Sequence, residues 1–283
     1  GRASYTETEK GITVKANGRT FVFSKKDGQL KDVSVNNRKI SFANGPRFIG
    51  ARRADRSLDQ FYNHDDEKAK AKDRTYSEFT DAAVFTKLDV KEEGGNLILT
   101  ANYKLGNLDK AQWTIHPDGM ATLDYTYNFS GVVDLMGICF DYPEEQVLSK
   151  RWLGAGPYRV WQNRIHGTQY NIWENDYNDP IPGETFTYPE FKGYFGSVSW
   201  MSIRTKEGTI SLTNETPDSY IGVYQPRDGR DRLLYTLPES GISVLNVIPP
   251  VRNKVNSTDL CGPSSQPKWV DGSQTGRLVI RFE

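Results

Sequence analysis

The chain has 283 residues, and its 36 Lys and Arg side chains balance its 36 Asp and Glu side chains, so the formal net charge is zero. Proteins that bind nucleic acids or anionic membranes usually carry a basic surplus, so this balance argues against both partners. No apolar run approaches the roughly 20 residues of a membrane-spanning helix. The first residues lack the apolar stretch of a signal peptide, so none is expected. The length is sufficient for one large all-β domain with a substantial core.

The cysteines and the common cofactor motifs give no sign of a cofactor. Cys139 and Cys261 are too far apart for a zinc knuckle or a CxxC redox pair, and the apolar run 136–140 predicts that Cys139 is a buried thiol. The sequence has no Walker A loop, no H-E-x-x-H, no G-x-S-x-G and no G-x-G-x-x-G after a strand. We therefore expect no cofactor, no resident metal and no dependence on a disulfide.

The first forty residues alternate between apolar and polar side chains, which is typical of strands with one buried face. Four such stretches, at 12–16, 20–24, 30–35 and 39–42, are separated by Asn17-Gly18, Asp27-Gly28 and Asn36-Asn37. An Asn-Gly or Asp-Gly pair between two alternating stretches is the strongest short-range signal for a β-hairpin. The pattern predicts a β-meander.

Residues 47–80 interrupt this rhythm with the charged clusters 52–56 and 64–72. We interpret them as a long solvated excursion from a β-scaffold, in which 64–72 can form one exposed helix. His64, Asp65 and Asp66 offer metal-binding groups, but adjacent residues on an exposed segment are weak evidence for a metal site.

Alternating stretches return in the rest of the chain, and no long amphipathic helix or low-complexity linker separates them. They lie at 83–90, 97–103, 111–115, 120–127, 198–203, 209–212, 219–224, 241–247 and 277–282. Many short strands at regular turn spacing favour a sandwich or barrel. We predict one domain over residues 1–283, folded as a large antiparallel β-sandwich.

Aromatic side chains are concentrated in residues 151–200, interleaved with amides, carboxylates and arginines. This mixture suits a sugar, because the C–H face of a pyranose packs on an aromatic ring while its hydroxyls need short polar partners. Most of these rings are expected in the core, and the best candidates for ligand contact are Trp161, Trp173 and Tyr177. The polar candidates beside them are Asn163, Arg164 and His166, of which His166 could also act in acid–base chemistry. The segment Trp173–Gly183 is interpreted as a polar loop, and the oxygen atoms of 174–179 would also accept calcium.

The block Arg151–Pro157, followed by Asn163 and Arg164, resembles the W-x-G-x-G-P…E-x-Y-x-D-R block of the family-two β-galactosidases. The resemblance extends to 18–30, which is similar to that family's opening hairpin, and to 188–193, which is similar to its P-Q-E-N-G segment. In those enzymes the block lies in the C-terminal, or small-chain, β-sandwich domain. The resemblance implies a supersandwich akin in shape to galactose mutarotase.

The same resemblance implies a partner and a role. Enzymes of that family carry two catalytic carboxylates in a (β/α)₈ barrel domain, and this chain has no repeated strand–helix pattern for such a barrel. The chain is then an accessory domain that shapes the substrate site of a catalytic barrel domain during carbohydrate degradation. By itself it is expected to be inactive. A parent that degrades polysaccharide would favour a periplasmic or extracellular location.

Two departures from the family pattern bear on the site. The Glu and Asp of the family block are matched here by Arg159 and Asn163. Near the C-terminus, Cys261 lies near the place of a tryptophan that many relatives direct into the active site. The resemblance implies that Asp259 and Cys261 contact sugar there, and the different residues imply that the sugar differs. Two alternatives stay open: a free-standing carbohydrate-binding module, and a mutarotase- or lyase-like enzyme that uses His166 with a carboxylate.

Overall fold

The computed structural model describes residues 1–53, 76–177, 193–223, 237–251 and 262–283. These residues form strands, turns and two short 3-10 helices, so the all-β prediction is confirmed. Within this part of the chain, no helix has the length and apolar character needed to cross a membrane.

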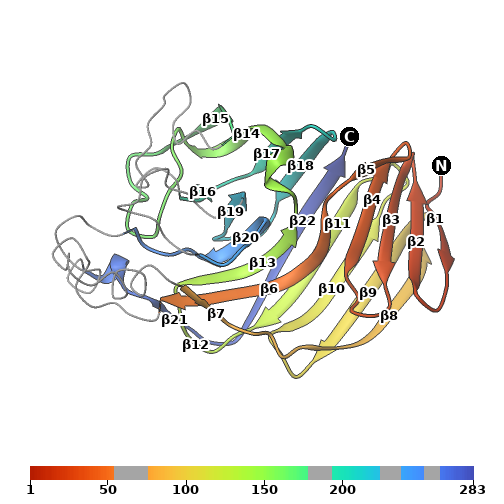
Figure 1. Ribbon diagram of the computed structural model, residues 1–283, viewed down its shortest axis with the longest axis horizontal. Helices are drawn as coiled ribbons and strands as arrows, with labels where there is room; N and C mark the ends of the chain where they lie inside the picture. The colour runs from red at the N-terminus through yellow and green to blue at the C-terminus, as the bar shows by residue number, and fades with distance from the viewer. Residues whose placement is uncertain (54–75, 178–192, 224–236, 252–261) are drawn as a thin grey trace.

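Two large antiparallel sheets are stacked face to face (Figure 1). Among the described residues, eleven strands form the first sheet: β1 (Ser4–Glu7), β2 (Gly11–Ala16), β3 (Arg19–Ser24), β4 (Leu30–Val35), β5 (Arg38–Ile40), β6 (Ala43–Arg53), β7 (Tyr76–Glu78), β13 (Leu135–Asp141), β16 (Phe195–Gly196), β19 (Tyr220–Val223) and β20 (Ile242–Val247). Their order is β1-β2-β3-β4-β6-β13-β20-β19-β16, with β5 paired to β4 and β7 paired to β6.

The second sheet has nine described strands: β8 (Val84–Glu93), β9 (Asn96–Lys104), β10 (Leu108–Ile115), β11 (Ala121–Asn128), β14 (Val147–Gly156), β15 (Gln169–Asp176), β17 (Trp200–Thr205), β18 (Thr209–Asn214) and β22 (Ser273–Phe282). Their order is β15-β14-β17-β18-β22-β11-β10-β9-β8, so β8 and β15 are its two edges. The remaining elements are the two-stranded sheet of β12 (Gly131–Val133) and β21 (Lys268–Val270), and the 3-10 turns η1 (Glu144–Gln146) and η5 (Pro263–Ser265).

The predicted meander is confirmed as the antiparallel series β2, β3, β4 and β5. Asn17 and Gly18 both have positive φ, 45° and 76°, which is the geometry of a two-residue hairpin turn that matches strand twist. Inward positions alternate with outward ones along β2 and β3. The local sequence pattern is therefore sufficient to account for this part of the fold.

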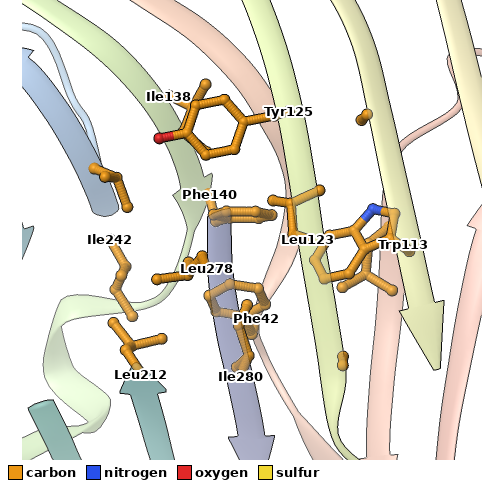
Figure 2. Packing of buried hydrophobic residues seen from close by; sticks show 14 of the residues in the cluster. Phe42, Trp113, Leu123, Tyr125, Ile138, Phe140, Leu212, Ile242, Leu278 and Ile280 are labelled. Atoms are coloured by element: carbon orange, nitrogen blue, oxygen red, sulfur yellow. The ribbon is translucent and has the colours of Figure 1, made fainter. Parts of the chain in front are cut away.

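The core lies between the two sheets (Figure 2). Phe140 from β13 and Ile242 from β20 face Leu123, Leu278 and Trp113 of the nine-stranded sheet, and all five are essentially inaccessible. Phe140 stacks on Phe42 with ring centroids 4.5 Å apart and meets Trp113 edge-on at 6.0 Å. One buried cluster thus extends across both sheets.

The structure corrects two sequence interpretations and bears on two others. Residues 47–53, which were expected in a solvated excursion, instead belong to the long strand β6, whose apolar run 48–51 is mostly buried and pairs with β13. The segment from Trp173 onward begins inside strand β15 rather than in a loop. Cys139 is buried and free, as expected.

The proposed helix at 64–72 and its His64 cluster lie outside the described residues.

Candidate functional site

The candidate site lies where the connection 157–168 joins β14 to β15. Trp161 and Arg164 close a tight turn through reciprocal backbone hydrogen bonds, of 2.9 Å from the Arg164 amide and 3.4 Å from the Trp161 amide. The Trp161 ring is 0% exposed and meets Tyr194 edge-on at 5.8 Å. Burial of this ring anchors the turn and leaves Gln162 and Asn163 at its tip.

Gln162 and Asn163 hold two segments that are distant in sequence. The Asn163 side-chain amide donates to the Val251 carbonyl at 2.6 Å, and its oxygen accepts from the Val251 amide at 2.9 Å. The Gln162 side-chain amide donates to the carbonyls of Ser264 at 2.6 Å and Gln266 at 2.8 Å. The residues on either side of segment 252–261 are therefore attached to the same turn.

The remaining predicted residues lie around this turn. Arg164 and His166 are exposed on the connection, and Tyr158 donates a 2.9 Å hydrogen bond to the His166 carbonyl. Asp259 and Cys261 lie outside the described residues, but residues 251 and 262–266 place the ends of their segment beside Asn163. The structure thus brings the polar candidates and the ends of the C-terminal candidate segment to one place.

Trp173 and Tyr177 lie farther along the β14–β15 hairpin, with Tyr177 at its far end beside Leu148. Trp173 is half-buried and directly opposite Trp152 in the strand register, and its indole donates to the Gln169 carbonyl at 3.1 Å. A Cβ added at Gly156 would lie 2.4 Å from the Trp173 ring, so this glycine lets the ring pack on the strand. Tyr177 donates to the Glu144 carboxylate, and the Lys150 ammonium lies 5.2 Å from its ring centroid.

The predicted aromatic contacts therefore need correction at one position. Trp161 was expected to face a ligand, but its ring is enclosed and has no accessible surface in this structure. The turn folds so that the ring is enclosed, while the side-chain amides of Gln162 and Asn163 bond to the segments on either side of 252–261. Trp173 and Tyr177 keep partly accessible rings.

A cavity of about 330 Å³ adjoins the connection 157–168. Its lining includes Ile165 and Thr168 from the connection, Asp218 from the turn before β19, Tyr220 from the start of β19, and Lys268 from β21. The volume falls at the lower end of the range for small-molecule sites, and one carboxylate, one ammonium and one phenol are suitable partners for sugar hydroxyls. Burial, followed by the nearby Asp218 charge, raises the pKa of Tyr220, so its hydroxyl stays protonated as a donor.

Sequence reasoning missed Gln162, Asp218, Tyr220 and Lys268. Gln162 directly precedes a predicted residue, so a turn assignment at 161–164 would have found it. Asp218 has a positive φ of 49° in the turn before β19, and the sequence Thr216-Pro217-Asp218-Ser219 is a turn signal. Lys268 gave no signal, because only the pairing of β21 with β12 brings it to the cavity.

A second cavity, of about 410 Å³, lies beside η1, and two of its lining carboxylates, Asp141 and Glu144, already have partners. Asp141 accepts from Arg47 at 2.9 Å and from Asn44 at 2.7 Å, and Glu144 accepts from Tyr177. Both carboxylates are therefore engaged in interactions that hold the fold together. Among the described residues, no group of three or more His, Cys, Asp or Glu side chains is arranged to hold a metal ion.

These features define a two-sheet supersandwich whose candidate site lies at one end of the nine-stranded sheet. The galactose 1-epimerase of Lactobacillus acidophilus NCFM has a similar fold, with a TM-score of 0.52 and 7% identity over 100% of this chain and 98% of that one. An α-N-acetylgalactosaminidase of Bifidobacterium bifidum aligns over 96% of this chain and 36% of its own length, with 12% identity and a TM-score of 0.45. The predicted mutarotase-like supersandwich is confirmed.

The sequence comparison assigns the chain to a narrower group of proteins than the fold similarity does. The family described as beta galactosidase small chain matches residues 15–246. The chain belongs to the β-galactosidase small-chain family, which confirms the resemblance inferred from the 151–164 block. No curated protein sequence matches the chain.

Proposed function

We propose that residues 1–283 form one accessory domain that works with a catalytic barrel domain of β-galactosidase type in carbohydrate degradation. The observation that carries this proposal is the match of the small-chain family to residues 15–246, since a small chain implies a larger partner. In this proposal the partner supplies the carboxylate pair for glycoside cleavage, and this chain shapes access to it.

The part of the chain that meets the substrate is the end of the nine-stranded sheet around the 161–164 turn. The hydrogen bonds from Gln162 and Asn163 to residues 251, 264 and 266 support this assignment, because they hold the ends of the segment that carries Asp259 and Cys261 beside Arg164 and His166. Asp259 then accepts a hydrogen bond from a sugar hydroxyl, and Cys261 supplies a small apolar contact. Trp173 lies on the neighbouring part of β15, whereas Tyr177 lies at the far end of the β14–β15 hairpin, beside Leu148.

Kinetics of the full-length parent test the assignment. Asp259→Ala should lower kcat/KM about tenfold, which corresponds to about 1.4 kcal/mol of transition-state stabilisation, with little change in melting temperature. The matched control is Asp89→Ala, an exposed carboxylate paired with Lys87 on the opposite edge strand, which should leave the kinetics unchanged. Unchanged kinetics of Asp259→Ala together with a large drop in stability would assign the segment a structural role.

Assays of the isolated chain separate the accessory role from its alternatives. The proposal expects no glycoside cleavage and no sugar epimerisation by the chain alone, and gain of activity when it is added to a catalytic chain that lacks it. Epimerisation that His166→Ala abolishes would instead establish an enzyme. Tight oligosaccharide binding without any effect on a catalytic chain would establish a binding module.

A further inference from the structure

The outer face of the nine-stranded sheet carries an apolar patch at its β15 end. The strand register places Ile172 of β15 opposite Leu153 of β14, and Leu153 opposite Trp200 of β17. Tyr170 lies two residues before Ile172 and therefore on the same face of β15. Tyr170 is 59% and Ile172 is 47% exposed, while Leu153 and Trp200 are half-buried. We call these four residues the β15 patch.

The patch is ordered before any partner arrives. The Tyr170 hydroxyl and the Ser199 hydroxyl are hydrogen-bonded at 2.6 Å, which fixes the exposed ring against the sheet. An aromatic side chain that is already fixed loses little conformational entropy when it is covered. Tyr and Trp are also the residues that most often dominate protein–protein contacts. The patch therefore has the composition and rigidity of an interface centre.

Charged side chains border the patch in an acidic and a basic group that lie next to each other, because the register places Arg151 directly opposite Glu174. The acidic group, Glu174 and Asp176, lies on β15, whereas the basic group, Arg151 and Arg204, lies on β14 and β17. All four side chains are exposed. Within the part of the chain that the structure describes, none of the four takes part in an ion pair. The border is thus neutral in total but acidic on one side and basic on the other.

We propose that the β15 patch is the contact surface between two copies of this chain. A twofold contact uses the same surface on both copies, so that surface must be complementary to itself. A twofold rotation can place the acidic group of each copy against the basic group of the other while the four apolar side chains pack at the centre. A border of a single charge would instead repel a second copy.

Sedimentation of the isolated chain over roughly a hundredfold range of concentration tests the proposal, because self-association depends on concentration. The unmodified chain should shift from monomer to dimer, and Ile172→Lys should remain monomeric. The matched control is Val84→Lys: Val84 lies on β8, the opposite edge of the same sheet, and is 45% exposed. This control should dimerise like the unmodified chain, and circular dichroism should show that both variants keep their β structure.

A charge exchange tests the twofold arrangement itself. One variant carries Arg151→Glu and Arg204→Glu, and the other carries Glu174→Lys and Asp176→Lys. Each should dimerise more weakly alone because like charges then meet, and an equimolar mixture should form a heterodimer. A chain that stays monomeric at every concentration, an equal effect of Val84→Lys, or a mixture that does not associate would each overturn the proposal. Protection of the patch by a different protein, with no dimer of this chain, would also overturn it.

Discussion

The two ends of the nine-stranded sheet are built in different ways (Figure 1). At the β8 end, successive strands are joined by short hairpins, and the edge strand carries the charge pairs Lys87–Asp89 and Lys91–Glu93. At the β15 end, the edge strand exposes Tyr170 and Ile172, and its connection to β14 runs through residues 157–168. Charged side chains on an edge strand discourage pairing with other chains, whereas apolar ones invite contact. The comparison separates an end whose edge strand carries charge pairs from an end whose edge strand exposes apolar side chains.

The source of order also differs between the ends. Asp81 at the β8 end accepts hydrogen bonds from the amides of Ala83, Asn107 and Leu108, all within 27 positions of it. Asn163 at the β15 end bonds to Val251 and Ser265, which are 88 and 102 positions away. The Asp81 anchor at the β8 end therefore joins segments closer in sequence than those joined by the Asn163 anchor at the β15 end, which forms only after distant segments have come together.

The largest expected effect concerns the tryptophans that face each other at the β15 end. Trp152 is 0% exposed, donates to the Ala155 carbonyl at 2.9 Å and meets Phe195 edge-on at 4.9 Å. Trp152→Ala should lower the free energy of unfolding by about 3–5 kcal/mol. Trp173→Ala should cost about 1–2 kcal/mol, because its ring is only half-buried. Urea denaturation measures both, and equal losses would mean that the outer strand is as much a part of the core as β14.

Removing one hydrogen-bonding side chain at each end tests how far along the sequence each one stabilises the fold. Asn163→Ala should cost about 1–3 kcal/mol, because it leaves the Val251 backbone without its partner. Hydrogen exchange should then accelerate at residues 251 and 265–266, far away in sequence. Asp81→Ala is the matched control, and its faster exchange should stay within residues 83 and 107–108. If Asn163→Ala accelerated only its immediate neighbours, the turn would not be a long-range anchor.

Alkaline pH is expected to weaken the β8 end through Tyr103. Its hydroxyl donates to the Asp27 carbonyl at 2.5 Å, and burial, with smaller contributions from Asp27 and Asp81, raises its pKa above the ordinary value of 10.0. The stability that the protonated phenol contributes is present below pH 10 and is lost as the pH rises beyond it. Tyr103→Phe should therefore cost about 1 kcal/mol at neutral pH. That difference should shrink above about pH 10. A difference that is constant with pH would show that Tyr103 ionises as freely in the folded state as in the unfolded one.

The smallest effect is expected at the turn between β9 and β10, next to the β8 end. Leu105 is 83% exposed and has a φ of 72°, a left-handed conformation that is unfavourable for a leucine. Leu105→Gly should raise the free energy of unfolding by about 0.5–1 kcal/mol, because relief of the backbone strain exceeds the entropy cost of glycine. Thermal denaturation measures the change. A less stable variant would show that the leucine side chain contributes more than its conformation costs.

The sequence predicted the fold well where strands and turns are formed by residues a few positions apart. The turns at Asn17-Gly18 and Asn36-Asn37, and the alternating stretches that became β8 to β11, depend on residues a few positions apart. The 151–164 block also identified the family, and the match over residues 15–246 confirmed it. Propensity and periodicity were sufficient in these places because each strand pairs with the next one in the chain.

Only the tertiary structure could show the features that depend on contacts between segments distant in the sequence. The apolar run 48–51 directly precedes a charged cluster and was expected in a loop, and only its pairing with β13 makes it part of a buried strand. The accessibility of a ring depends on what covers it, so the sequence placed Trp161 at a surface although the fold encloses it. The cavity beside Tyr220 and the patch around Tyr170 likewise depend on strand order, because each combines residues of the β14–β15 hairpin or its connection with residues of later strands. Local pattern determines which residues form strands, and long-range pairing determines which side chains share a surface.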